Sequence, residues 1–205
     1  MDEIFSIFLQ TFDNPVDRQE VPLSSIGRYR GRLPDLLLDY WAEHGWCGYG
    51  DGIFWTVNPQ DYDGVVASWL EGTFLEGRDK YHVIARSAFG DLYLWGEKTG
   101  YSLNISSIVS RCVVTNYKIT PDEMDKELQQ FFLSRNVDSN DFGDLFKPAK
   151  KKLGILRHDE MYGFVPAFML GGPDTLDHIE KVKAVEHLIL LSQITELQPY
   201  SFSDI

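Results

Sequence analysis

The spacing of apolar residues predicts helices alternating with strands along this chain. Apolar positions recur every three or four residues, as on an amphipathic helix, over residues 4–12, 33–44, 59–70, 121–132 and 182–194. Between residues 81 and 114 the period changes to two, which predicts strands at Tyr81–Ser87, Leu92–Trp95, Tyr101–Ile105 and Val109–Val113, and Tyr162–Leu170 is predicted as a further strand. The pattern favours an α+β fold, an antiparallel β-meander flanked by amphipathic helices, with a smaller C-terminal α/β lobe.

The segment from residue 33 to residue 59, LPDLLLDYWAEHGWCGYGDGIFWTVNP, is the predicted packing centre. It holds Trp41, Trp46 and Trp55, and aromatic side chains bury more area than others. A helix is expected to begin at Pro34 and end at Gly45, and a glycine-rich turn and a buried strand follow it. Neither a helix nor a Lys-Ser/Thr pair follows the glycines directly, so the sequence favours a tight turn over a phosphate-binding loop.

Acidic side chains are spaced so that they share one face of the predicted helix. Asp35, Asp39 and Glu43 stand four residues apart, and like charges at that spacing destabilise a helix by only about 0.2–0.5 kcal/mol per pair. The stripe is therefore either a solvated face or a surface that meets a partner. Trp46 and Tyr49, beside the glycine turn, suit either the core or an interface. The residues predicted to contact a partner are Asp35, Asp39, Glu43, Trp46, Tyr49 and Asp51.

The formal net charge of −12 narrows the range of partners. Such a surface repels nucleic-acid phosphates but attracts basic proteins and speeds their encounter, although acidity also serves solubility alone. The chain has no run of eighteen apolar residues, and its N-terminus resembles neither a signal nor a transit peptide, so a soluble cytoplasmic protein is expected. Its two cysteines, Cys47 and Cys112, are predicted to be reduced and buried.

The residues that commonly carry catalysis do not form a recognisable set. His158, Asp159 and Glu160 are consecutive and so face different ways, and the chain has no HExxH, GxSxG or GxxxxGK[ST] motif. We therefore predict no catalytic, metal or cofactor site and no enzymatic activity. The lysines at 147, 150, 151 and 152 are expected to be a solvated face or an intramolecular counter-charge. Two alternatives stay open, a small-molecule hydrolase that uses carboxylates around Asp51 or His158 and a general protein-interaction scaffold.

Two long stretches resemble a known bacterial family. RYRGRLPDLLLDYWAEHGWCGYGDGIFWTVNPQDY resembles the signature of the GAD-like domain, and DEMYGFVPAFMLGG with IEKVKAVEHLILLSQI resembles the domain that usually accompanies it. The arrangement is also similar to the SUKH class of immunity proteins. The resemblance implies a GAD-like domain at 1–115 and a C-terminal immunity-associated domain at 116–205.

The resemblance also implies a function. Members of this paired-domain family resemble immunity proteins that neutralise type VI secretion effectors, several of which are DNases. We therefore expect this chain to bind a basic nuclease toxin in the bacterial cytoplasm, with no direct contact to nucleic acid or membrane and with no cofactor. Inhibition would follow either from covering the toxin's active site or from binding elsewhere and distorting or disassembling the toxin.

Overall fold

One large sheet organises the chain. A computed structural model describes residues 2–13, 15–115 and 118–200. Eight strands lie in the order β1-β2-β3-β4-β5-β6-β7-β10, so the first seven are neighbours in chain order, all antiparallel, and β10 runs parallel to β7. The strands are β1 (Val16–Gln19), β2 (Trp46–Tyr49), β3 (Phe54–Thr56), β4 (Tyr81–Ser87), β5 (Leu92–Gly96), β6 (Gly100–Ser106), β7 (Arg111–Val114) and β10 (Gln198–Pro199). The predicted α+β fold with an antiparallel meander is confirmed.

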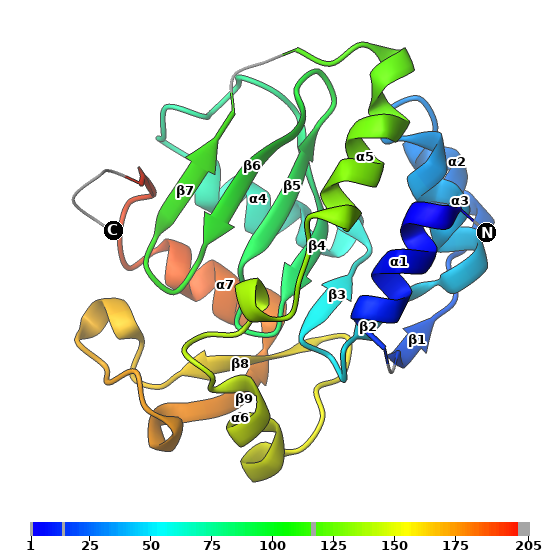
Figure 1. Cartoon of the computed structure of the whole chain (residues 1–205). Coiled ribbons are helices and arrows are strands. Elements are labelled where there is room, and N and C mark those ends of the chain that lie inside the picture. The colour runs from blue at the N-terminus through cyan, green and yellow to red at the C-terminus, as the bar shows by residue number, and fades with distance from the viewer. Residues whose placement is uncertain (1, 14, 116–117, 201–205) are drawn as a thin grey trace.

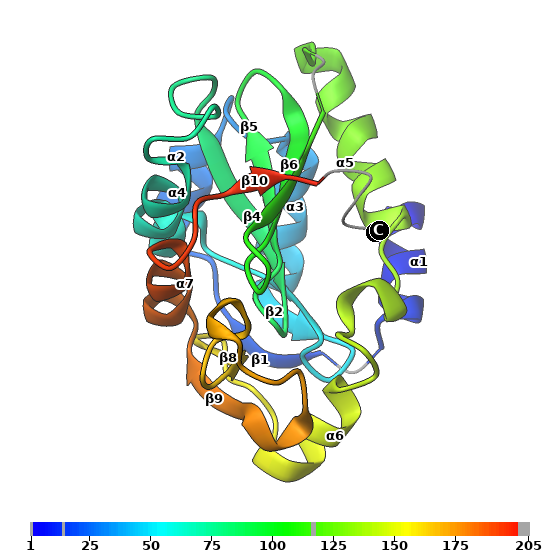
Figure 2. The same ribbon diagram turned by 90° about the vertical axis from the view of Figure 1, so that its left-hand side faces the viewer.

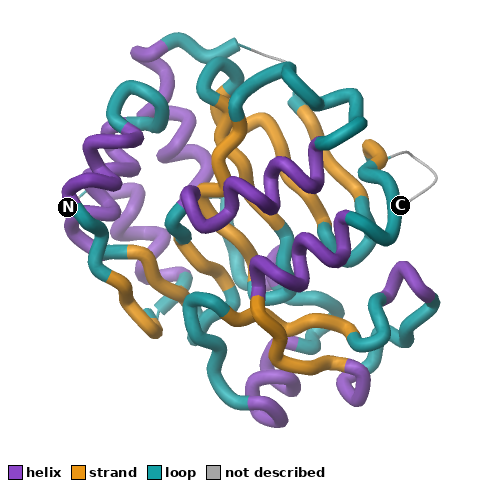
Figure 3. The backbone as a smooth tube through the Cα atoms, turned by 180° about the vertical axis from the view of Figure 1, so that it is seen from behind, coloured by secondary structure: helices purple, strands orange, loops and turns teal. Residues whose placement is uncertain are grey.

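Helices cover the sheet from two sides. Figures 1 and 2 show α1 (Glu3–Thr11) and α5 (Met124–Leu133) on one side and α4 (Asp63–Leu70) and α7 (Ala184–Ser192) on the other. Figure 3, seen from behind, shows the latter two crossing the strands. Helix α3 (Asp35–His44) packs against α5 and against α2 (Leu23–Tyr29). No helix in the described part of the chain is long and apolar enough to cross a membrane.

The smaller lobe is built on a separate hairpin. Strand β8 (Glu160–Phe164) pairs with β9 (Ile179–Lys183), beside helix α6 (Phe146–Leu153), at the lower end of the sheet in Figure 1. The predicted strand to Leu170 was too long, because Pro166 has no N–H to donate to a ladder. The predicted C-terminal helix also began too early, since its first two residues belong to β9.

A strand replaces part of the predicted glycine turn. Gly48 lies in β2, where a Cβ atom would come within 2.8 Å of the Trp55 ring, so only glycine allows this close approach. The turn itself is confined to residues 50–53, with positive φ at Gly50, Asp51 and Gly52. The predicted packing centre is thus two paired strands and the helix before them.

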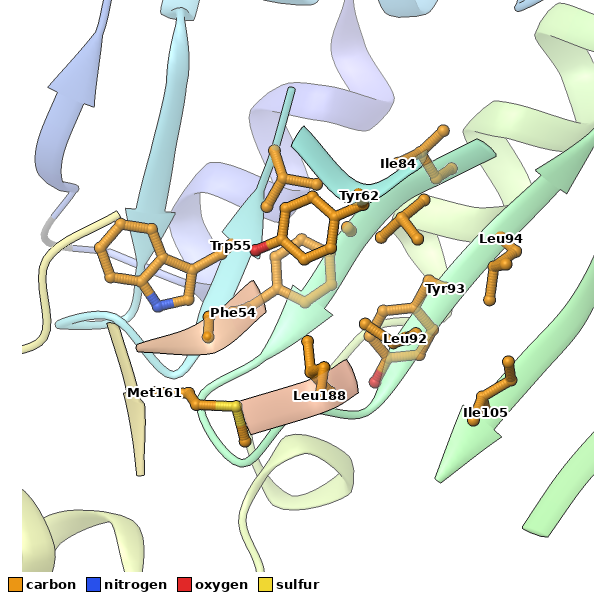
Figure 4. Packing of buried hydrophobic residues seen from close by; sticks show 14 of the residues in the cluster. Phe54, Trp55, Tyr62, Ile84, Leu92, Tyr93, Leu94, Ile105, Met161 and Leu188 are labelled. Carbon is orange, nitrogen blue, oxygen red and sulfur yellow. The ribbon is translucent and has the colours of Figure 1, made fainter. Parts of the chain in front are cut away.

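Aromatic side chains form much of the core. Phe5 and Phe8 of α1 pack on Tyr49 and on Phe132 of α5, with ring centroids 5.0–6.4 Å apart. All five tryptophans are buried, as are both cysteines. Figure 4 shows the core near the second lobe, where Met161 of β8 and Leu188 of α7 lie close to side chains of the sheet. The core therefore runs continuously from the N-terminal helix to the C-terminal lobe.

A buried arginine joins the sheet to that lobe. Arg86 of β4 is fully buried, and its guanidinium carbon lies 5.0 Å from the centroid of the Trp55 ring. Nε donates to the Tyr62 hydroxyl at 2.9 Å, and Nη2 donates to the backbone carbonyls of His158 (3.0 Å) and Glu160 (2.7 Å). The planar guanidinium can reach all these oxygens at once, which an ammonium group cannot.

Candidate partner-binding surface

The outer face of α3 carries the predicted acidic stripe. Leu37, Leu38, Tyr40 and Trp41 of this helix are buried, which leaves Asp35, Asp39 and Glu43 exposed on the opposite face. Pro34 precedes the helix as its N-cap instead of forming its first turn, and Gly45 ends it with a φ of 76°. Within the described residues no ion pair joins Asp35 or Asp39 to a basic side chain, so their charges face solvent.

Helix α5 extends the acidic surface beyond what the sequence predicted. The backbone N–H of Leu36, in the first turn of α3, donates to Asp125 Oδ1 at 3.1 Å. Asp122 is exposed in the short helix η2 (Pro121–Glu123), which leads directly into α5. We call Asp35, Asp39, Glu43, Asp122 and Asp125 the acidic helical face. The contact that joins its two halves spans 89 residues of sequence and leaves no local signal.

A third helix is held in place by another carboxylate. Asp2 caps α1 by accepting the N–H of Phe5 at 3.1 Å, and its second oxygen accepts Gln129 Nε2 of α5 at 2.7 Å. Burial alone would raise the pKa of the Asp2 carboxyl, but these hydrogen bonds outweigh it and keep the pKa below its usual value. Helix α5 thus packs on both α1 and α3, and α3 and α5 carry the acidic helical face.

The two aromatic residues of the prediction lie in the core. Tyr49 is 2% exposed and sits against Phe5 and Phe8, and burial raises the pKa of its hydroxyl well above 10. Trp46 is 8% exposed and packs edge-on against Trp41, with centroids 5.6 Å apart. The sequence left open whether these side chains were core or interface, and the structure places both in the core. Neither side chain belongs to the exposed acidic helical face, so a contact role for Trp46 and Tyr49 stays a prediction.

Asp51 already has a partner within the chain. Its Oδ2 atom accepts Lys150 Nζ of α6 at 2.7 Å, which ties the turn after β2 to the second lobe. Lys152 in the same helix lies 3.8 Å from Asp177 Oδ1 and donates to the Leu176 carbonyl at 2.9 Å. These two lysines act as intramolecular counter-charges, one of the two roles predicted for the cluster. The Asp51 carboxylate is therefore less available to a partner than the acidic helical face.

The histidine and two carboxylates of the hydrolase alternative do not converge. His158 Nδ1 lies 2.9 Å from Asp17 Oδ2, Asp159 pairs with Lys183, and Glu160 Oε2 lies 3.5 Å from Lys181 Nζ. His158 thus contacts β1, whereas Asp159 and Glu160 each pair with a different lysine of β9. Among the residues that the structure describes, no group of three His, Cys, Asp or Glu side chains is placed to hold a metal.

Comparison with known proteins identifies both parts of the chain. The family model of the GAD-like domain matches residues 3–109, and that of the T6SS immunity protein Tdi1, C-terminal, matches residues 125–195. The crystal structure of Atu4351 from Agrobacterium tumefaciens is similar with a TM-score of 0.85, covering 99% of this chain and 93% of that chain at 24% sequence identity, which shows the shared fold. Comparison with curated proteins gives no match. The chain belongs to the GAD-like domain family and carries behind that domain a region matching a type VI secretion immunity protein.

Proposed function

We propose that this chain is an immunity protein that binds a cognate type VI secretion toxin, a nuclease, in the cytoplasm of the producing bacterium. The observation that carries the proposal is the match of residues 125–195 to the C-terminal region of such an immunity protein. The acidic helical face supplies a surface of suitable charge. We also propose a non-enzymatic role, because an immunity protein acts by binding its toxin.

The charge of the surface suits a nuclease partner. A nuclease must present basic residues to bind phosphates, and a cluster of carboxylates competes for the same residues. Opposite charges on the two proteins also raise the association rate, by an amount that falls as salt screens them. Because α3 packs on α5 and α5 packs on α1, the carboxylates stand on helices that support one another, and a surface ordered before binding loses less entropy on binding.

Two modes of inhibition remain compatible with this surface. The acidic helical face either covers the phosphate-binding residues of the toxin or binds a basic region elsewhere and distorts the enzyme. The modes differ in competition, because only the first makes DNA and the immunity protein mutually exclusive on the toxin. A catalytically dead toxin, tested for DNA binding with and without the immunity protein, separates them.

The proposed function is tested first by protection of cells from the toxin and then by neutralising the acidic residues of α3. Co-expression should restore growth to cells that make the cognate toxin, and the two proteins should co-purify. The triple variant Asp35→Asn, Asp39→Asn, Glu43→Gln should associate more slowly and with a weaker salt dependence. Its thermal stability should be unchanged or slightly higher, since two like-charge pairs of about 0.2–0.5 kcal/mol each are removed.

A control variant loses the same number of negative charges outside the acidic helical face. Glu71, Asp174 and Glu180 are exposed and lie outside the acidic helical face, so their conversion to Gln, Asn and Gln should alter association much less. Equal association rates for the two triple variants would show that net charge, and not this face, drives the encounter. Failure to bind the toxin or to restore growth would refute the proposed function.

A further inference from the structure

A small pocket with an aromatic wall opens on the surface near the edge of the sheet. It has a volume of about 220 Å³ and lies between the β1–β2 ribbon, the helix η1 (Pro59–Tyr62) and the start of the second lobe at His158. Small-molecule sites usually measure about 300–1,000 Å³, so this volume suits one long side chain better than a free ligand. The pocket lies outside the acidic helical face.

The inner wall of the pocket is apolar. Trp46, Val57 and Pro22 line it. The Trp46 indole Nε1 is buried and has no hydrogen-bond partner among the described residues. Buried indole N–H groups usually find an acceptor. Trp41, Trp69 and Trp95 also lack such a partner, but Trp46 is the one of these that lines this pocket.

The outer wall of the pocket is acidic. Glu20 and Asp61 both line the pocket and are exposed, and in the described part of the chain neither forms an ion pair with a basic side chain. Asp61 is oriented, because its Oδ1 accepts Asn58 Nδ2 at 3.0 Å while Asn58 Oδ1 accepts the Gln60 N–H at 3.3 Å. The His158 ring, on the far wall, is held through Nδ1 by Asp17.

Together these features match a single chemical group. An aliphatic stem packs well on an indole and a valine, and a cation near an aromatic ring and two carboxylates gains both cation–π and Coulomb attraction. We infer that the pocket receives a lysine or arginine side chain of the partner protein, with arginine preferred.

This inference rests on the proposed function, since a basic partner is what supplies the side chain. The overall net charge of −12 favours such a partner. The pocket would act as an anchor that fixes the register of the complex, whereas the acidic helical face acts mainly on the rate of encounter. Arginine at the centre of a pocket is a common form of interface hot spot.

The test uses a small probe and does not need the toxin. Nα-acetyl-L-arginine methylamide carries the guanidinium and two carbonyls, and the citrulline analogue has nearly the same shape without the charge. The indole N–H signal of Trp46, assigned with a Trp46→Phe variant, is followed by NMR in the full chain. The arginine probe should shift this signal with saturation, and the citrulline probe should bind at least about tenfold more weakly.

Two variants decide the assignment. The double variant Glu20→Gln, Asp61→Asn should bind the arginine probe about tenfold more weakly, because it removes both carboxylates of the pocket. Both residues are exposed, so the variant should fold as the parent does. The acidic-face variant Asp35→Asn, Asp39→Asn, Glu43→Gln should bind the probe as the parent does. An unmoved Trp46 signal, or equal shifts with both probes, would overturn the inference even if the chain binds and neutralises its toxin.

Discussion

Replacing Arg86 by methionine tests the joint between the sheet and the C-terminal lobe. The substitution keeps a similar side-chain volume but removes the donors to the Tyr62 hydroxyl and to the carbonyls of His158 and Glu160. It also removes the donor to the Ser87 carbonyl, but that oxygen still accepts the Gly90 N–H. A fully buried acceptor left without a donor costs about 1–3 kcal/mol, and the His158 and Glu160 carbonyls are only partly buried. Methionine also removes the cost of burying a charge, which offsets part of this loss. We therefore take the lower end of the range for three acceptors, a loss of about 3 kcal/mol in the free energy of unfolding.

Urea unfolding followed by tryptophan fluorescence measures this loss, since Trp55 lies beneath the guanidinium. For a chain of this length, about 3 kcal/mol corresponds to a fall in Tm of roughly 6–12 °C. The Tyr162 amide, which donates to the Ala88 carbonyl at 2.9 Å across the same joint, should also exchange its hydrogen faster. Arg28→Met is the control, because Arg28 is exposed on α2 and its loss should cost less than about 0.5 kcal/mol.

The lysine variant separates charge from geometry. Arg86→Lys keeps a buried cation but cannot reach all the oxygens, so it should also lose stability. If Arg86→Met unfolded within about 0.5 kcal/mol of the parent, the reasoning would be wrong, and packing alone would hold the lobe to the sheet.

Three further predictions concern the interior and the lobe contact. Burial raises the pKa of the Asp91 carboxyl above its usual value of 3.8, so the contribution of this group to stability is greatest below pH 3.8 and falls as the pH rises through the folded-state pKa. The stability of Asp91→Asn relative to the parent should therefore increase between about pH 3 and 7, as measured by urea unfolding at several pH values. A difference in stability that stayed constant with pH would contradict this. Gly90 has a φ of 90° and a Cβ there would lie 2.5 Å from Met161 Cε, whereas Gly154 has a φ of 83° and no neighbour within 4 Å. Gly90→Ala should thus lose more than about 1 kcal/mol and more than Gly154→Ala by thermal unfolding, and equal losses would mean that backbone strain alone acts. Lys150→Met and Asp51→Asn, combined in a double-mutant cycle, should show a coupling of about 0.2–1 kcal/mol that falls at high salt, and a salt-independent coupling would rule out an ion pair as its source.

The meander could be predicted because its signal is local. Strands β4, β5 and β6 alternate in sequence and are joined by short turns, so chain order alone places them side by side. The helices at α1, α3 and α5 also follow from periodicity. Strand β2 was missed because Gly48 has no side chain, and the reason for that glycine, the Trp55 ring beside it, lies in another strand.

The site was less predictable, because its shape depends on contacts between distant segments. The stripe on α3 was visible in the sequence, but Asp125 joins it only through the bond to the Leu36 amide. Nor does the sequence reveal that Asp51 is paired with Lys150 from the second lobe. Whether Trp46 and Tyr49 face inward depends on which helices cover the β2 strand, and that is a tertiary property.

The pairing of β10 with β7 has a consequence for how the molecule behaves at high concentration. An uncovered edge strand is a template for pairing with other chains, and β7 would be such an edge without Gln198 and Pro199 beside it. Pro199 also has no N–H to offer on the outer side. This short strand therefore reduces the tendency of the sheet edge to pair with other chains. Its removal should increase aggregation while the chain still folds.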